Sequence, residues 1–311
     1  MNVAVTTGAS AGERRSWRDR DGEISFVEWA DEGNADRPTL HFAHANGFNG
    51  FTYRHLLAPL SKNFRIRAWD ARGHGMTSLP ADPASHRDWL VYRDDLIRFI
   101  EAWAAETGEP VMLAGHSMGG AMSVMAAAMR PDLVRGLLLI DPVLIPNRQR
   151  RVINLVQKLG LGRSNGFDLA RGAEKRRAEF PDAETMLRAY TGRGAFRTWP
   201  QDVIADYIEG GTVALPDGTL TLACAPVWEA ANFRAQGHDS VSPITDLKAP
   251  LTLIYAGAGS TCRAPVPALL AEHDPKATIL RIGRATHFIP MEFPDTIRRE
   301  AVDLQARIAG A

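Results

Sequence analysis

Apolar positions along this chain fall into short, nearly continuous runs that alternate with longer stretches of helical periodicity. Short continuous apolar runs are typical of parallel strands that are buried on both faces of a sheet. Strands that alternate with helices predict an α/β fold with a doubly wound, mostly parallel sheet. The predicted strands are Glu23–Ala30, Thr39–Ala43, Arg65–Trp69, Val111–Ala114, Gly136–Ile140, Leu251–Ala256 and Thr278–Ile282. The predicted helices are Tyr53–Leu60, Trp89–Glu106, Ala121–Met129, Val266–Glu272 and Asp295–Ile308.

The alternation stops between residue 142 and about residue 245, where the pattern is mainly helical. An insertion between two strands of the sheet would lie over the carboxyl edge of that sheet. We therefore expect a polar leader at 1–22, a core made of 23–141 and 246–311, and a cap domain inserted at 142–245. The candidate cap helices are Asn147–Leu159, Asp182–Tyr190, Gln201–Glu209 and Glu229–Gln236, with one hairpin from Thr212–Leu215 to Thr219–Cys224.

Composition narrows the class of protein. A chain of 311 residues that is 45% hydrophobic and 23% charged suits one large domain with an insertion. The formal net charge is zero, so nothing points to a nucleic-acid partner. Two cysteines fit a reducing compartment, and no apolar run approaches the roughly 20 residues of a membrane span. We expect a cytoplasmic protein without a membrane span; the oligomeric state stays open.

The most informative motif is Gly115-His116-Ser117-Met118-Gly119, which stands between a predicted strand and a helix of small residues. A serine on such a tight turn projects its hydroxyl away from the backbone, as the nucleophile of a serine hydrolase requires. The helix that begins there also directs free N–H groups at an oxyanion beside the serine. The alternative is a glycine-rich turn with a solvated serine.

A base and an oxyanion hole are predicted near Ser117. His287 follows the last predicted strand, comes after the serine in chain order, and has a side chain that exchanges protons near neutral pH. The loop after the strand at residues 39–43 contains Asn46 and Phe48, whose backbone N–H groups could face that of Met118. The alternative for this loop is an ordinary Asn-Gly turn.

Together these residues resemble the α/β-hydrolase superfamily, and specifically its capped, esterase-like branch. The resemblance runs from about Glu23 to Ile308 and rests on four matches in the right order. They are the loop His44–Gly50, the turn Asp70–Ser78, the elbow Gly115–Gly120 and the histidine loop Thr286–Glu292. The resemblance implies that Asp70, Arg72 and His74 are structural turn residues.

The triad acid departs from the family pattern. In most members the acid follows strand seven, but the corresponding loop at 255–263 holds no carboxylate. Some members place the acid after strand six, where this chain has Asp141 followed by Pro142. The resemblance therefore implies Asp141 as the acid, while an Asp-Pro pair also occurs as a plain strand-ending turn. Weaker alternatives are Asp239, Asp246, Asp274 or a Ser-His dyad.

Serine at the elbow selects among the reactions of this fold. Dehalogenases and epoxide hydrolases of the family use an aspartate there, so Ser117 argues against both. Serine with histidine suits acyl transfer, and we expect a carboxylic ester hydrolase that acts on a small-molecule substrate. The alternatives are a carbon–carbon bond hydrolase, a lactonase, or a non-catalytic ligand-binding receptor of the same fold.

The remaining chemistry is sparse. No histidine or cysteine spacing indicates a metal, and no phosphate-binding loop follows a strand, so we expect neither metal nor cofactor. Residues 147–200 hold 12 Lys or Arg against 5 Asp or Glu. That excess is either a solvated cap face or a field that steers an anionic substrate. Four aromatic residues could line a pocket or pack cap against core: Trp199, Tyr207, Trp228 and Phe233.

Overall fold

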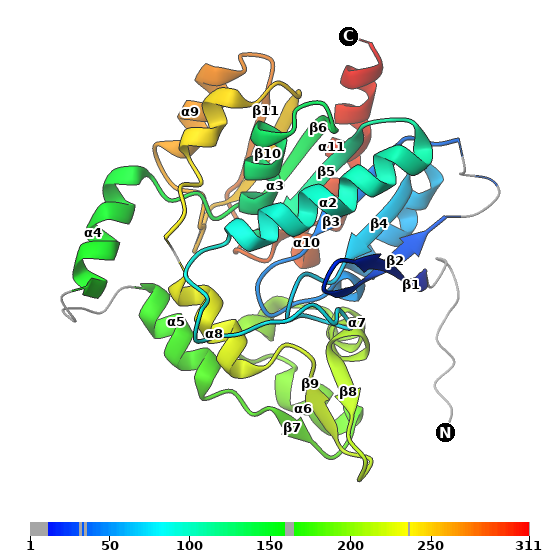
Figure 1. Cartoon of the computed structure of the whole chain (residues 1–311), viewed down its shortest axis with the longest axis vertical. Helices are drawn as coiled ribbons and strands as arrows, with labels where there is room; N and C mark the ends of the chain where they lie inside the picture. The colour runs from blue at the N-terminus through cyan, green and yellow to red at the C-terminus, as the bar shows by residue number, and fades with distance from the viewer. Residues whose placement is uncertain (1–11, 31–32, 34–35, 159–164, 236, 311) are drawn as a thin grey trace.

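The computed structural model describes residues 12–30, 33, 36–158, 165–235 and 237–310. Its centre is an eight-stranded sheet in the order β1-β2-β4-β3-β5-β6-β10-β11 (Figure 1). The strands are β1 (Glu13–Asp19), β2 (Gly22–Trp29), β3 (Thr39–Ala43), β4 (Arg65–Trp69), β5 (Val111–His116), β6 (Val134–Ile140), β10 (Leu251–Ala256) and β11 (Thr278–Ile282). The seven predicted strands are confirmed, with ends that differ by at most two residues.

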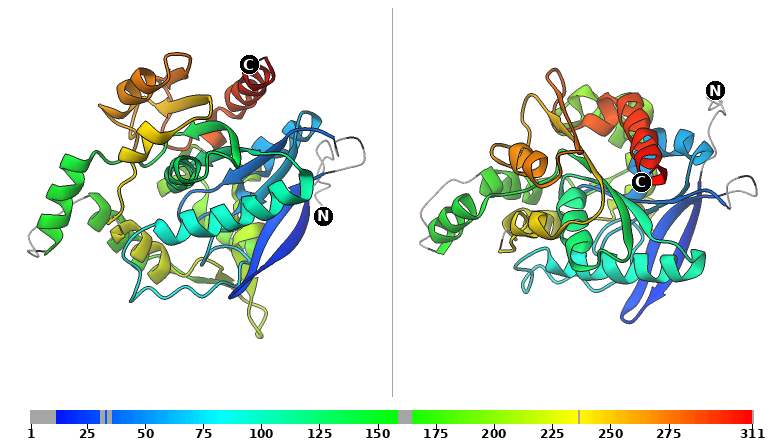
Figure 2. Two further views of the ribbon diagram at one scale, coloured as in Figure 1. Left: turned by 45° about the horizontal axis from the view of Figure 1, so that its top comes forward. Right: turned by 90° about the horizontal axis from the view of Figure 1, so that it is seen from above.

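Helices cover both faces of the sheet (Figure 2). The 12-residue α3 and the 18-residue α2 pack on one face, and α11 packs on the other with the short α1. The side chains of β6 alternate between these two layers, with Leu137 on one side and Leu138 on the other. The helical elements are η1 (Gly50–Tyr53), α1 (Arg54–Leu57), η2 (Ala58–Lys62), α2 (Leu90–Thr107), α3 (Met118–Met129), η4 (Ser242–Asp246), α9 (Val266–His273), α10 (Ile289–Glu292) and α11 (Pro294–Ala309).

The pairing of the strands is mostly parallel, as expected. Strands β4, β3, β5, β6, β10 and β11 pair in parallel, whereas β1 and β2 add an antiparallel edge. The expected polar leader at 1–22 is wrong from Glu13 onward, because residues 13–19 form β1. Most of β1 is exposed, so it lacks the apolar run that marks a buried strand. Strand β1 is fixed to the sheet edge by its backbone pairing with β2. A hydrogen bond from Arg14 Nη1 to Asp70 Oδ2 (2.6 Å) adds to this attachment.

The segment between β6 and β10 contacts loops at the carboxyl ends of the sheet strands. Asn49 Nδ2 donates to the carbonyl of Tyr207 at 3.2 Å, and Trp228 Nε1 donates to the carbonyl of Arg72 at 3.1 Å. The predicted hairpin is present, but a short strand and a helix before it were not predicted. The elements are α4 (Asn147–Lys158), α5 (Asn165–Glu174), β7 (Glu179–Phe180), α6 (Ala183–Tyr190), η3 (Gly194–Thr198), α7 (Gln201–Gly211), β8 (Thr212–Ala214), β9 (Leu220–Leu222) and α8 (Pro226–Arg234).

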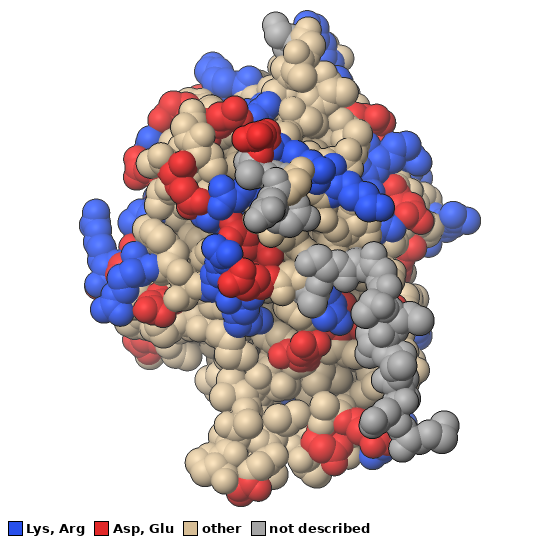
Figure 3. All heavy atoms as spheres, turned by 90° about the vertical axis from the view of Figure 1, so that its right-hand side faces the viewer, with Lys and Arg blue, Asp and Glu red and all other residues tan. Residues whose placement is uncertain are grey.

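Charges are mixed over the surface where they can be seen. On the face in Figure 3, basic and acidic side chains lie next to one another instead of forming separate fields. Among the described residues, no helix has the length and apolar character that crossing a bilayer requires.

Four histidines are fully buried in this fold: His41, His44, His74 and His116. Burial lowers the pKa of His44 to about 4 and the pKa of each of the other three to about 3. In an unfolded chain a histidine has a pKa of about 6.5. Below pH 6.5 the unfolded chain therefore binds protons that the folded protein does not, and stability present above that pH is lost as the pH falls toward 4.

Acid should thus destabilise the protein steeply between pH 6.5 and 5. Each of the four histidines contributes on the order of 1 kcal/mol of loss per pH unit in this range. Urea unfolding at several pH values measures the slope. In the variant His41→Leu the slope of unfolding free energy against pH should decrease by the contribution of one histidine. Leucine suits this position because the ring of His41 packs against Trp69 and Phe99 in apolar surroundings. A slope in His41→Leu equal to that of the wild type would contradict the prediction.

Candidate active site

Ser117 stands at the sharp turn between β5 and α3. Its backbone has φ 57° and ψ −116°, a left-handed conformation that non-glycine residues seldom adopt. The two flanking glycines allow this turn through close packing. A Cβ on Gly115 would lie 2.4 Å from the carbonyl oxygen of Gly119, and a Cβ on Gly119 would lie 2.0 Å from that of Ala43. Glycine is required at both positions because neighbouring backbone segments approach too closely to leave room for a Cβ.

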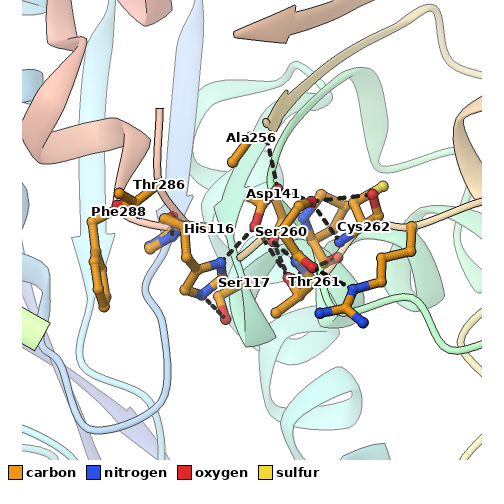
Figure 4. A network of polar contacts seen from close by, with 12 residues as sticks. His116, Ser117, Asp141, Ala256, Ser260, Thr261, Cys262, Thr286 and Phe288 are labelled. Carbon is orange, nitrogen blue, oxygen red and sulfur yellow. Dashed lines mark hydrogen bonds and ion pairs between the residues drawn. The ribbon is translucent and has the colours of Figure 1, made fainter. Parts of the chain in front are cut away.

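Three side chains that the sequence analysis singled out meet at this turn. His287 Nε2 lies 3.0 Å from Ser117 Oγ, and His287 Nδ1 lies 2.6 Å from Asp141 Oδ2 (Figure 4). Ser117 follows β5, Asp141 follows β6, and His287 comes from the loop between β11 and α10. Three separate strand ends thus supply one hydrogen-bonded line.

Asp141 is fully buried and surrounded by donors. The N–H of Ala256 donates to Oδ1 at 2.9 Å, the hydroxyl of Ser260 donates to Oδ1 at 2.5 Å, and the N–H of Thr261 donates to Oδ2 at 3.0 Å. Burial acts to raise the pKa of Asp141, but the hydrogen bond and charge of His287, together with the hydrogen bonds from Ser260 and Ala256, hold that pKa below the usual value. The carboxylate is consequently kept ionised.

The loop after β10, which holds no carboxylate, supports Asp141. The hydroxyl of Ser260 donates a hydrogen bond to the carboxylate of Asp141. Thr261 Oγ1 donates to the backbone carbonyl of Asp141 at 2.7 Å. Asp141 also has a positive φ of 40°. An aspartate tolerates this conformation better than most residues.

The expected oxyanion donors differ in availability. The N–H of Phe48 donates to the carbonyl of Ala45 at 3.1 Å, so this group is already used in a turn. The N–H groups of Asn46 and Met118 have no hydrogen-bond partner in the described part of the chain. Asn46 is positioned by its side chain, whose Nδ2 donates to the carbonyl of Glu229 at 3.0 Å. Asn46 and Met118 are therefore the better pair of donors.

Histidines outside the hydrogen-bonded line organise the loop at 44–50. His44 Nε2 accepts from the N–H of Ala71 at 2.8 Å, and His74 Nε2 accepts from the N–H of Gly47 at 3.0 Å. Asp70 Oδ1 accepts from the N–H of Gly50 at 2.9 Å. These contacts make His44, Asp70 and His74 structural supports of the loop.

Comparison with known proteins places the chain in a family. A family profile described as alpha/beta hydrolase matches residues 42–300. The chain belongs to the alpha/beta hydrolase family. It is 26% identical over 258 residues to a 2-(acetamidomethylene)succinate hydrolase of Mesorhizobium japonicum, a match that covers 83% of this chain and 84% of the relative.

Two further comparisons extend this picture. A monoglyceride lipase of Rattus norvegicus is 29% identical over 163 residues, which cover 49% of this chain and about half (53%) of the lipase. A crystal structure of E-2-(acetamidomethylene)succinate hydrolase aligns with a TM-score of 0.76 at 22% identity, covering 95% of this chain and 99% of that one. The predicted α/β-hydrolase fold is thereby confirmed.

Sequence reasoning missed one polar network of this alpha/beta hydrolase. The hydroxyl of Tyr53 accepts from the N–H of Ala45 at 3.1 Å and donates to His116 Nδ1 at 2.8 Å. His116 Nε2–H donates to the backbone carbonyl of His287 at 2.9 Å, because a carbonyl can only accept. The network joins the loop at 44–50, the elbow and the histidine loop. No local pattern pairs a tyrosine with a histidine 63 residues later, so only the fold reveals it.

Proposed function

We propose that this alpha/beta hydrolase cleaves carboxylic esters through an acyl-enzyme intermediate, with Ser117 as nucleophile, His287 as base and Asp141 as acid. The observation that carries the proposal is the continuous line of hydrogen bonds among these three side chains, 3.0 Å and 2.6 Å long. The order serine, aspartate, histidine along the chain is that of the family.

In the first half-reaction, the Ser117 oxygen attacks the ester carbonyl while His287 Nε2 takes its proton. The carbonyl oxygen becomes an oxyanion, to which the N–H groups of Met118 and Asn46 donate. Each such donor is worth roughly a hundredfold or more in rate. The tetrahedral intermediate then collapses, and His287 gives the proton to the departing alcohol.

In the second half-reaction, water attacks the acyl group on Ser117 and His287 takes its proton. The second tetrahedral intermediate then collapses: the bond from the acyl carbon to Ser117 Oγ breaks, His287 returns the proton to that oxygen, and the carboxylic acid leaves. Asp141 accepts the Nδ1–H of His287 throughout, so it fixes the tautomer and stabilises the imidazolium. We also propose that residues 142–245 act as the cap, because they contact the loops that flank Ser117. No residue of this scheme requires a metal or cofactor.

Hydrolysis of p-nitrophenyl acyl esters of graded chain length, together with labelling by a fluorophosphonate, tests the proposal. We expect turnover, and peptide mapping should find one label, on Ser117. Ser123→Ala is the matched control, because this buried serine only donates to the carbonyl of Gly119 at 2.7 Å. It should label like the wild type. A well-folded protein that shows neither turnover nor label would refute the proposal and favour the ligand-binding receptor.

A second candidate is hydrolysis of a substrate other than a simple ester by the same three residues. The broad match to a 2-(acetamidomethylene)succinate hydrolase, over most of both chains, favours it. Parallel assays on lactones, amides and diketones distinguish this candidate: label on Ser117 without turnover of any ester would support it.

A further inference from the structure

Arg176 lies in a polar and aromatic cage that residues of the segment 142–245 form. Its Nη1 donates to Glu229 Oε2 at 2.9 Å, and its Nη2 donates to the hydroxyls of Tyr207 and Tyr190 at 2.5 and 3.3 Å. The centre of the guanidinium lies 5.4, 5.9 and 5.6 Å from the ring centroids of Tyr190, Phe196 and Tyr207. Arg176 follows α5, and Glu229 lies on α8 beside it (Figure 1).

The cage adjoins the loop at 44–50. Glu229 Oε1, the oxygen that Arg176 does not contact, lies 2.7 Å from where a Cβ on Gly47 would be. The carbonyl of Glu229 accepts the Asn46 side chain at 3.0 Å. The carboxylate of Glu229 thus lies between the guanidinium of Arg176 and the loop that holds Asn46. Any side chain larger than that of glycine at position 47 would collide with this carboxylate.

Aromatic rings connect the cage to the triad. The ring of Tyr207 lies 5.8 Å from that of Phe48, and Phe48 lies 6.4 Å from His116 and 6.3 Å from Phe288. His116 and Phe288 are the neighbours in sequence of Ser117 and His287. Aromatic side chains therefore form a continuous series of contacts from the guanidinium to the neighbours of the reacting groups.

The ion pair has unused capacity. A guanidinium has five N–H donors, and Arg176 uses three of them on described residues. Its side chain keeps 18% of its surface exposed, while Glu229 keeps 11%. A largely buried ion pair adds little to stability compared with apolar side chains of similar size. Toward the described residues the remaining donors, Nε–H and one Nη1–H, are unused, and each can form a charge-assisted hydrogen bond with a carboxylate.

We propose that Arg176 binds a carboxylate of the substrate, so that the preferred esters are small and anionic. This inference rests on the proposed ester hydrolysis. The excess of 12 basic over 5 acidic residues in 147–200 acts in the same direction, by attracting an anion toward the cap.

The test compares monoethyl esters of dicarboxylic acids, from succinate to suberate, with neutral ethyl esters of equal chain length. Monoethyl adipate and ethyl hexanoate are one such pair. Because hydrogen bonds to charged groups are worth about 1.5 to 3 kcal/mol, the wild type should favour the best anionic ester about tenfold or more in kcat/KM. The preference should lie mainly in KM.

Three variants assign this preference. Arg176→Gln should reduce the anionic-to-neutral ratio to about one, and Arg176→Gln with Glu229→Gln should do the same without leaving an unpaired buried carboxylate. Arg177→Gln is the matched control: this neighbouring arginine is exposed and donates to the carbonyl of Glu179 at 2.7 Å. It should keep the wild-type ratio.

Calorimetric titration of Ser117→Ala protein with the same uncleaved esters supplies a readout without turnover. Tighter binding of the anionic ester, lost in the Arg176 variants, supports the inference. Equal affinity for both esters, or a preference that survives in the double variant, overturns it. Absence of ester turnover with intact anion-selective binding would count against the proposed function alone.

Discussion

Asp141→Asn should lower kcat by about 10⁴-fold while the fold stays intact. An asparagine has the same shape, but its amide nitrogen cannot accept the Nδ1–H of His287, which now bonds at 2.6 Å. The imidazole would then take the wrong tautomer, and Nε2 could no longer accept the serine proton. Steady-state kinetics on p-nitrophenyl esters at neutral pH measures the loss, and circular dichroism checks the fold.

Asp274→Asn is the matched control for this change. Asp274 was a weaker candidate for the acid, and its Oδ1 accepts only from the backbone N–H of Lys276 at 2.9 Å among the described residues. Turnover should stay near the wild-type value in this variant. Retention of more than a tenth of the activity by Asp141→Asn would show that His287 is oriented by something else.

Ser117→Ala should reduce kcat by a factor on the order of 10⁵ to 10⁶, the largest loss of any single change. Without the hydroxyl no acyl-enzyme forms, and only the oxyanion donors and substrate binding remain to promote attack by water. The double variant Ser117→Ala with Asp141→Asn should be no slower than Ser117→Ala. The aspartate promotes the reaction only by orienting His287, and His287 in turn needs the serine hydroxyl. Single-turnover assays at high enzyme concentration measure these residual rates.

Ser123→Ala provides the reference for loss of a buried serine hydroxyl in the same helix. It should cost some stability and little turnover. Additive losses in the double variant would instead mean that Asp141 and Ser117 act independently, which contradicts a triad.

Local patterns predicted what depends on neighbours in sequence. The elbow around Ser117 is set by Gly115 and Gly119, and the helix predicted at 89–106 forms as α2. Strand β1 was missed because an exposed edge strand carries little hydrophobic signal. From sequence alone, Phe48 and Asn46 are equal candidates for the oxyanion donor. They differ in the structure, where the N–H of Phe48 already donates to the carbonyl of Ala45.

Contacts over long sequence separations could not be predicted in the same way. Tyr53 meets His116 across 63 residues, and Arg176 meets Glu229 across 53. Such pairs depend on tertiary packing, the first within the core and the second within the segment at 142–245. Asp141 lies at a strand end, a position that the topology fixes, and its Oδ2 lies 2.6 Å from His287 Nδ1. Its role as the acid stays a prediction.

Because the carboxylate of Asp141 follows β6, the loop after β10 has to supply only hydrogen-bond donors and no acid. Asp141 is carried by an interior strand, and the loop holds it with the backbone N–H groups of Ala256 and Thr261 and one hydroxyl. Backbone donors do not depend on side-chain identity. An exposed position of this loop such as Ala258 can thus vary in sequence, so that a new surface function can arise there without altering any reacting group, whereas Gly259 is restricted by its φ of 65°.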